Sequence, residues 1–470
     1  MRAFSAIVKL TLHNAVRSHI FQLLLIVLTV CAIGIPLTVA GDGTAGGFIQ
    51  VALLYSFSSV SAILALSSLW VSCFIMTQDI ESYQLHMVVS KPVSRIKIWL
   101  AKYTGVLIMH LFLLILSALA IYFIIIWQFT RQDFSKTDRE KIESEVLVGR
   151  RVFNFAPPNI EERSKAMLRE RLQKMAETGE RITITSRNEK SILEEMRRMA
   201  IAENAQAKYD EIHEWRFENF PVDAKNRQTL FLRYRTYVGK VSTKDQRMTS
   251  GIWYIGVPQF ERDTQGRIVD ESKYQIRYYQ YPPSTIRSGE FDEIVLPKQL
   301  PVVTPDGKVF LAYRNIDPER QTQYFQPSDG PKILMKVTGF FANYSRAVAV
   351  IMLELVILTG LGCAFSSFLS LPTAIFLSVA YLFFGSFATY LAESASASDT
   401  FIKILSDVLL FFVIPLQKFG VTDMVSKGEL IELSFMGMLI LSYFILRTLP
   451  LVLVGMFIYK RREIGLVVRK

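Results

Sequence analysis

The chain has 470 residues, of which 51% are hydrophobic, and its mean hydropathy is +0.28, which points to a membrane protein rather than several soluble domains. All three cysteines lie in apolar stretches, which excludes a disulfide-rich secreted module. Much of the net charge of +11 lies at the termini and in one short loop, where a positive-inside bias explains it without a nucleic-acid partner.

The amino-terminal residues 1–19 are expected to form an amphipathic helix. The apolar positions that recur at helical spacing are Phe4, Ile7, Val8, Leu12 and Val16. Lys9, His13 and Arg17 fall largely elsewhere. Such a helix suits the cytoplasmic interface of a membrane, just before the chain enters the bilayer. A frayed extension of the first span is the alternative, but the pattern covers about four turns.

Six stretches are apolar over the roughly 20 residues that a helix needs to cross a bilayer. They are Phe21–Ala40, Phe48–Met76, Thr104–Trp127, Val348–Phe368, Thr373–Leu391 and Ile431–Tyr459. A seventh stretch, Phe401–Phe419, is shorter and contains Lys403, Asp407 and Pro415, so we interpret it as re-entrant or interfacial. The first span begins too late and runs too long for a cleavable signal peptide, and we expect it to remain.

Basic residues indicate on which side of the membrane each part lies. The amino end carries Arg2, Lys9 and Arg17. The basic residues of the carboxyl end are Lys460, Arg461, Arg462, Arg469 and Lys470. Positively charged flanks favour the cytoplasm, so both termini are expected there, which requires an even number of crossings. Six spans in the inner (cytoplasmic) membrane therefore fit, and residues 128–343 become one extracytoplasmic domain.

The sequence pattern of this outer domain predicts an α+β fold. Ile160–Thr178 has the pattern of a charged helix, and Ser186 with Glu189 forms a capping box that opens a second helix running toward Trp215. From about Gln228 the apolar period changes to two, in short segments typical of a β-sandwich. These segments are TLFLRYRTYV, GIWYIGV, YQIRYYQY, DEIVLP and KVFLAYR.

No catalytic constellation stands out in the chain. The domain has no HExxH, no GxSxG and no paired Cys/His spacing, and His213 is its only histidine. Several aromatic residues could stack on a sugar, although strand alternation alone explains them as core residues. They are Trp253, Tyr254, Tyr278, Tyr279 and Tyr281. We therefore predict no catalytic residues, no metal site and no enzymatic activity in this chain.

The loop between the second and third spans, residues 77–102, carries the strongest functional signal. Asp79 and Glu81 follow the end of the span, and SYQLHMVV can form two helical turns before Pro92 stops them. Ser94 can then cap the helix that leads into the third span. The apolar side chains of the short helix are Leu85, Met87 and Val88. A connector has no need of so many exposed apolar groups, which favours contact with another protein.

These features resemble the permease subunits of ABC-2 type transporters, most closely the single-chain six-span permeases of the NosY kind. The likeness lies in the acidic end of the second span, in SKPVSR and KYTG, in the amino-terminal KLTLHNAVRSHIFQLLL, and in the basic tail ending at Glu463. Ser82-Tyr83 departs from it, since family members often have Gly-Thr there. The resemblance covers the six spans and the termini, whereas the large insertion is not a constant part of the family.

The resemblance implies a division of the chain into an elbow helix (1–19), three spans with a cytoplasmic coupling loop (20–127), the outer domain (128–343), and three spans with the segment 401–419 and a basic tail (344–470). It also implies a permease, usually an exporter, that pairs with a second copy or a related permease. The residues it assigns to ATPase coupling are Asp79, Glu81, Tyr83, Leu85, His86, Lys91, Pro92 and Arg95.

The chain itself has no GxxxxGK[ST] phosphate loop. A permease of this kind therefore binds no cofactor of its own and needs a separate cytoplasmic ATPase that binds ATP and Mg²⁺. The charged residues of the loop, Asp79, Glu81, Lys91 and Arg95, would orient the short helix on that partner. The alternative is that these charges simply solvate a loop.

Two charges lie inside predicted spans, Glu354 in the fourth and Arg447 in the sixth. A charge at bilayer depth costs roughly 2.5–3.5 kcal/mol, so each is expected to face the protein interior. Our hypothesis is that the two pair, either to line a path or, as we favour, to fix helix packing.

Two other classes of function compete with the permease. One is a membrane-anchored sensor or scaffold that uses the outer domain to bind envelope partners. The other is an enzyme with an outer active site, which the missing catalytic motifs make the weakest of the three.

Overall fold

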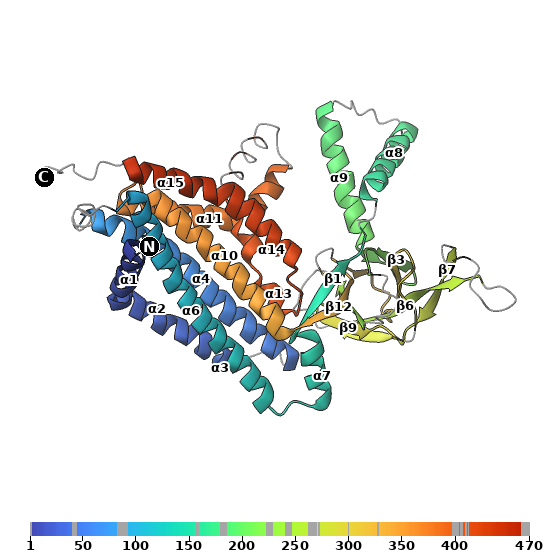
Figure 1. Ribbon diagram of the computed structural model, residues 1–470. Coiled ribbons are helices and arrows are strands. Elements are labelled where there is room, and N and C mark those ends of the chain that lie inside the picture. Colours follow the sequence, from blue (N-terminus) through green and yellow to red (C-terminus); the bar gives the residue numbers. More distant parts are fainter. Residues whose placement is uncertain are drawn as a thin grey trace. The chain divides into compact units, whose positions relative to one another are not determined.

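The computed structural model describes residues 2–39, 45–81, 93–156, 159–178, 186–221, 229–239, 247–261, 270, 273–298, 300–326, 329–396, 404, 408, 411 and 413–461. The chain divides into two compact units (Figure 1). The first, Met1–Gly149 with Thr338–Lys470, is helical, and the second, Arg150–Val337, is rich in β-strands.

The helical unit contains, in chain order, α1 (Arg2–Arg17), α2 (His19–Thr29), the π-helix η1 (Val30–Gly34), α3 (Ile35–Thr38), α4 (Ala45–Glu81), α6 (Arg95–Arg131), α7 (Lys136–Glu145), α10 (Phe340–Ser366), α11 (Leu371–Ser396), the 3₁₀ helix η2 (Leu416–Phe419), α13 (Thr422–Ser426), α14 (Leu433–Leu439), the π-helix η3 (Ile440–Thr448) and α15 (Leu449–Arg461). Proline explains why two of these helices are irregular. Pro36 follows η1 and Pro450 follows η3, and neither can donate a backbone hydrogen bond to the preceding turn.

Within the described part of the chain, six helical stretches are long and apolar enough to cross a membrane, as predicted. They are His19–Thr38, Ala45–Gln78, Arg95–Arg131, Phe340–Ser366, Leu371–Ala388 and Leu433–Arg461. The third begins at Arg95 rather than Thr104, and the fourth at Phe340 rather than Val348. The difference arises because hydropathy marks only the apolar part of a helix, whereas each helix continues through flanking polar residues.

Helices α4 and α10 form the centre of this unit. In their most apolar windows 61% and 67% of the residues are buried, against 17% in the first and last of the six stretches. Gly362 of α10 allows the close approach of the two helices. A Cβ atom there would collide with Ser72 Oγ and lie 3.0 Å from the Leu69 carbonyl oxygen. The absence of a side chain at Gly362 therefore sets the separation of these helices.

The predicted re-entrant segment Phe401–Phe419 lies largely outside the described residues. Its described end, Pro415 and η2, continues into α13 and packs inside the helical unit. Leu416, Phe419 and Val425 are buried, and the hydroxyl groups of Ser58 in α4 and Thr422 in α13 lie 2.7 Å apart. The segment is not among the six stretches described above, and its position relative to a bilayer stays a prediction.

The second unit contains antiparallel β-sheets and, among its described residues, two helices. Its elements are β1 (Val148–Asn154), α8 (Ile160–Thr178), α9 (Ser186–Asn204), β2 (Gln206–Ala207), β3 (Ile212–Phe217), β4 (Leu230–Arg235), β5 (Tyr237–Val238), β6 (Met248–Phe260), β7 (Tyr274–Gln280), β8 (Ser284–Arg287), β9 (Phe291–Val295), β10 (Val309–Asn315), β11 (Gln323–Tyr324) and β12 (Lys332–Gly339). The sheet orders are β1-β12-β4-β9, β3-β10-β6-β7 with β8 also pairing with β6, and β2-β11-β5.

The two larger sheets share one hydrophobic core, as a sandwich requires. Leu232 of β4, Trp253 of β6 and Leu311 of β10 are all almost completely buried in it. The prediction that the aromatic residues are core residues is correct for Trp253 but wrong for Tyr279, which is 37% exposed. Tyr279 differs because β7 is the last strand of its sheet.

A buried ionic triad ties three strands of the first sheet together. Glu293 of β9 accepts hydrogen bonds from Arg150 of β1 at 2.5 Å and from Arg233 of β4 at 3.0 Å. The Arg150 side chain is fully buried and its guanidinium lies over the Phe231 ring. One carboxylate therefore compensates two guanidinium groups that are removed from water.

The second helix of this unit ends earlier than predicted. Helix α9 begins at Ser186 as expected but ends at Asn204, and Trp215 lies in strand β3, so the prediction that the helix runs toward Trp215 was wrong. The segment IHEWRF alternates, and pairing with β10 buries Trp215 and Phe217. Pairing in a sheet outweighs the helical continuation because it buries both rings at once.

We expect Gly362→Ala to destabilise the helical unit by about 1–3 kcal/mol, because the added methyl group overpacks the contact between α4 and α10. Gly437→Ala in α14 is the matched control, since a Cβ there meets nothing within 4 Å. Thermal unfolding of the purified chain measures both. Equal effects of the two substitutions would contradict the close-approach argument.

We expect Glu293→Gln to destabilise the β-rich unit by about 3–5 kcal/mol, since it removes the negative charge that two buried guanidinium groups share. Glu290→Gln is the control, because the Arg287–Glu290 pair is about half exposed and contributes roughly 0–1 kcal/mol. Resistance to limited proteolysis in increasing urea is the measurement. If the control loses as much resistance, the triad has no special role.

Candidate functional site

The structure describes both ends of the predicted coupling loop. Asp79 and Glu81 belong to the last turn of α4, and Arg95 begins α6. Ser94 occupies the N-cap position with an extended backbone, although its side chain makes no capping hydrogen bond. The other predicted coupling residues lie outside the described residues: Tyr83, Leu85, His86, Lys91 and Pro92. The structure therefore shows how the two ends of the loop are attached to the helices.

The first turns of α6 are bonded to the ends of two other helices. The Arg95 guanidinium donates to the Lys460 carbonyl oxygen of α15 at 3.1 Å. The Trp99 indole donates to the Ser367 hydroxyl, at the end of α10, at 2.9 Å. That hydroxyl in turn donates to the Cys363 carbonyl oxygen at 2.8 Å. The start of α6 is thus joined to α15 and α10 by directional bonds.

The next turn of α6 is bonded to α4 and α10. The Lys102 ammonium donates to the Ile75 carbonyl oxygen of α4 at 2.9 Å, and this side chain is buried. The Tyr103 hydroxyl donates to the Val356 carbonyl oxygen of α10 at 3.1 Å, while its ring stacks on Trp99. The two ends of the loop are therefore connected directly, through Lys102 and Ile75.

Around these bonds lies a small buried cluster, which we call the anchor cluster. Its members are Met76, Ile98, Trp99, Cys363, Val452 and Tyr459. They come from α4, α6, α10 and α15, and each is at most 9% exposed. Because close-packed interiors transmit displacement, we expect a shift of the chain at Ser94 to move the neighbouring helices with it.

Helix α1 packs along the same part of α6. A Cβ at Gly105 would lie 2.8 Å from a Thr11 methyl group, and Thr11 and Ala15 are buried. The predicted pattern of α1 is confirmed in that Ile7 and Leu12 pack inward while Lys9, His13 and Arg17 are exposed. Val16 differs, since it is 48% exposed. The start of α6, the end of α15 and helix α1 therefore lie together at one end of the helical unit (Figure 1).

The two charged residues predicted to lie inside spans have different surroundings. Glu354 is buried in α10. Arg447, in η3, donates to the Val413 carbonyl oxygen at 3.2 Å, and its guanidinium lies over the Tyr443 and Phe411 rings. The ion pair between Glu354 and Arg447 stays a prediction, which a charge-swap experiment tests.

Sequence reasoning missed several buried polar groups of the same unit. His110 of α6 is fully buried, with Nε2 3.1 Å from the Ser67 hydroxyl and Nδ1 2.9 Å from the Val106 carbonyl oxygen. The recurring serines of α4, and the Lys102 and His110 side chains beside the apolar run of α6, were the available signal. Polar groups at such positions are costly unless they are paired inside the protein.

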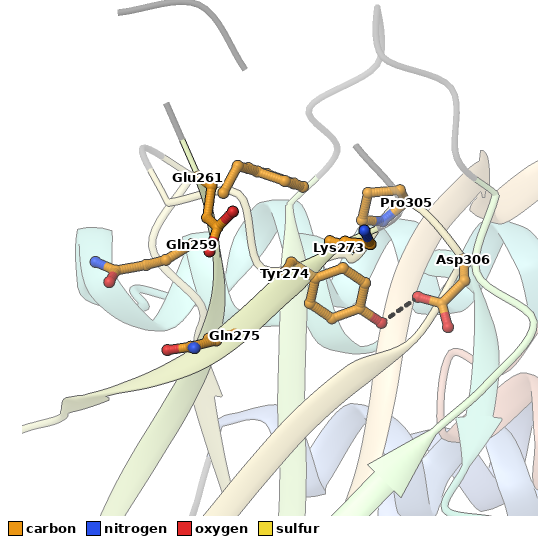
Figure 2. A pocket seen from close by; sticks show the side chains of 8 residues that line it. Gln259, Glu261, Lys273, Tyr274, Gln275, Pro305 and Asp306 are labelled. Atoms are coloured by element: carbon orange, nitrogen blue, oxygen red, sulfur yellow. Dashed lines mark hydrogen bonds between the residues drawn. The ribbon is translucent and has the colours of Figure 1, made fainter. Parts of the chain in front are cut away.

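The β-rich unit has an open pocket of about 910 Å³ where β6 ends and β7 begins. The residues that line it include Gln259, Glu261, Lys273, Tyr274, Gln275 and Asp306 (Figure 2). The Tyr274 hydroxyl points toward Asp306 and donates to its carboxylate at 2.5 Å, and Thr304 donates to the same oxygen at 2.6 Å.

These bonds define what Asp306 can do. Desolvation raises the pKa of its carboxyl group, but the hydrogen bonds from Lys308, Thr304 and Tyr274 outweigh it and hold that pKa below its usual range. The carboxylate is ionised at neutral pH and already accepts from three side chains. It therefore holds the turn at Pro305 in place and is unsuited to act as a general acid.

Among the described residues, no three His, Cys, Asp or Glu side chains gather as a metal-ligand set. Comparisons of the chain with protein-family models, with curated proteins and with solved structures find no match.

We expect Trp99→Leu to destabilise the helical unit by about 2–4 kcal/mol, because it removes the bond to Ser367 and leaves a cavity beside Tyr103. Amide hydrogen exchange at the start of α6 should accelerate together with that loss. Trp127→Leu, on the same helix but 48% exposed, is the control and should change neither quantity. A matching loss in the control would mean that the anchor cluster is not special.

Proposed function

We propose that this chain is the membrane-spanning permease subunit of an ABC transporter of the ABC-2 type. The observation that supports the proposal is the attachment of both ends of the loop between α4 and α6 to other helices. Directional bonds from Arg95, Trp99 and Lys102 join its ends to α15, α10 and α4. A loop that only connects two spans needs no such attachment, whereas a segment that transmits force needs a stiff base.

In the proposed mechanism, the segment between Glu81 and Arg95 sits on a cytoplasmic ATPase, which binds ATP and Mg²⁺. Closure of the ATPase displaces this segment. Because Arg95 holds α15 and Trp99 holds the end of α10, the displacement rotates or shifts α6 together with those two helices. The side chains of Asp79, Glu81 and Lys91 would orient the segment on the partner surface.

The charge distribution supports the direction of this arrangement. Helix α1 and the basic residues at the start of α6 and the end of α15 lie at the same end of the helical unit as the loop, and positive flanks favour the cytoplasm. We infer that both termini and the loop are cytoplasmic in the inner membrane and that the β-rich unit is extracytoplasmic. A second copy or a related permease would complete the transporter, with export as its direction.

A membrane-anchored sensor or scaffold is the second candidate. The β-rich unit supports it, since the α8–α9 pair and the open pocket near Tyr274 offer surface for an envelope partner. The two proposals differ in whether the chain needs an ATPase.

When the tagged full chain is purified from its native membranes, we expect an ATPase with a phosphate loop to co-purify with it. We expect Leu85→Asp to reduce the co-purified ATPase activity at least ten-fold, because it places a charge in the apolar contact. Ile212→Asp is the control, since this side chain is 60% exposed on β3, and it should leave the activity unchanged. Absence of any ATPase, or no effect of Leu85→Asp, would contradict the proposal.

Labelling of a single cysteine tests the sidedness independently. With Cys31, Cys73 and Cys363 replaced, a Leu85→Cys variant in intact cells should react with a membrane-impermeant maleimide only after the membrane is opened. An exposed position of the β-rich unit, Met248→Cys, should react in cells whose inner membrane is intact. The reverse pattern would refute the orientation and the permease with it.

A further inference from the structure

A cleft lies within the β-rich unit where the start of α8 and the end of α9 meet strand β3. It consists of two neighbouring cavities, of about 260 Å³ and 340 Å³, which share Ile160 and Asn204 in their linings. The smaller cavity is mainly apolar, with Phe155, Ile160, Ile201, Ala205, Trp215 and Phe325 among its lining residues. The larger one is polar. Together they fall in the size range of roughly 300–1,000 Å³ of small-molecule sites.

The floor of the cleft is one face of β3. His213 and Trp215 alternate on this strand and so point to the same side, with ring centroids 4.3 Å apart. Trp215 faces the apolar cavity, where Phe325 meets it edge-on, and His213 faces the polar cavity. Polarity therefore changes from one end of the cleft to the other over two residues.

Hydrogen bonds from backbone amides fix the walls of the cleft. Asn159 caps α8 by accepting from the Glu162 amide, and the Phe325 amide donates to the Ala205 carbonyl oxygen at 2.7 Å. The start of α8 and the end of α9 are thus fixed beside the sheet. A cleft that is already formed loses little free energy of ordering when a ligand enters.

The charged side chains of the polar cavity compensate one another. Arg163 makes two hydrogen bonds of 3.0 Å to Glu203, and Lys208 lies 3.8 Å from Glu211. Burial lowers the pKa of His213 below its usual range, so this ring adds no charge at neutral pH. The polar end of the cleft therefore offers hydrogen-bond donors and acceptors but no net charge.

From this geometry we propose that the cleft binds a single-chain amphiphile with an uncharged head group. The chain lies in the apolar cavity against Trp215, and a head group rich in hydroxyl or amide groups lies among Arg163, Lys208 and Glu203. A cavity of 260 Å³ is suited to one aliphatic chain, and the two cations that line the polar cavity are matched there by two carboxylates, while Lys332 lines the other cavity. This inference does not depend on the transporter proposal.

Photolabelling of the full chain in lipid nanodiscs tests the proposal. The probe is a monoacylglycerol that carries a diazirine in its chain, and peptide mass spectrometry locates the label. Probe dissolved in the bilayer labels the apolar spans in every sample and provides an internal reference. We expect additional label on the peptides that contain Ile160 and Ile201–Ala205, removed by excess unlabelled monoacylglycerol.

Two variants attack the cleft by different means. Ala205→Phe fills the apolar cavity and Ile201→Glu places a charge in it, and each should reduce cleft labelling at least ten-fold relative to the spans. Met199→Glu, on the same helix but 45% exposed and away from the cleft, should label like the wild type. A fatty-acid probe with the same chain should label the cleft several-fold less than the monoacylglycerol.

The proposal is overturned if label is confined to the spans, or if neither cleft variant reduces it. Equal labelling by the fatty acid overturns the assignment of an uncharged head group. If one cleft variant fails to fold, as judged by proteolysis of the β-rich unit, the other still decides the result.

Discussion

The helical unit depends on polar side chains of α4 that meet α13, α6 and α11. The Ser58 hydroxyl meets Thr422 of α13, the Ser67 hydroxyl meets His110 of α6, and the Cys73 thiol lies 3.5 Å from the Ser378 hydroxyl of α11. Between apolar helices in lipid there is little hydrophobic driving force, so close packing and hydrogen bonds select the partners. Gly362 completes the arrangement by letting α10 approach the backbone of α4.

The anchor cluster follows the same logic at the end of the bundle. There the polar groups are longer, because Arg95, Trp99, Lys102 and Tyr103 reach carbonyl or hydroxyl oxygens on three other helices. These four side chains lie within nine residues of one helix, so their displacements are coupled through its backbone. Such coupling is the physical property that a subunit driven by a separate ATPase requires.

The β-rich unit solves a different problem, since its sheets must bury large aromatic and charged groups at once. Trp215, Trp253 and Phe325 pack ring against ring in the core, while Glu293 compensates two arginines at the edge of that core. Among the described side chains of α8 and α9, Ser164, Met196 and Ala200 are buried, and exposed ion pairs such as Arg171–Glu195 connect the two helices. The start of α8 and the end of α9 are also fixed by hydrogen bonds from backbone amides, and the amphipathic cleft lies there.

Local sequence by itself determined the six apolar stretches, the amphipathic α1 and the strands β4, β5, β6, β7, β9 and β10, because each depends on the length or period of a hydrophobic run. It also marked the loop around Pro92 and the charges Glu354 and Arg447 as unusual. Only the tertiary structure decided that α9 stops at Asn204, that Tyr279 is exposed, that Trp99 bonds to Ser367, and that two cavities lie next to each other where α8 and α9 meet the sheet. These features depend on which segments meet, and residues distant in sequence carry no local sign of the neighbour that will satisfy their hydrogen bonds or cover their rings.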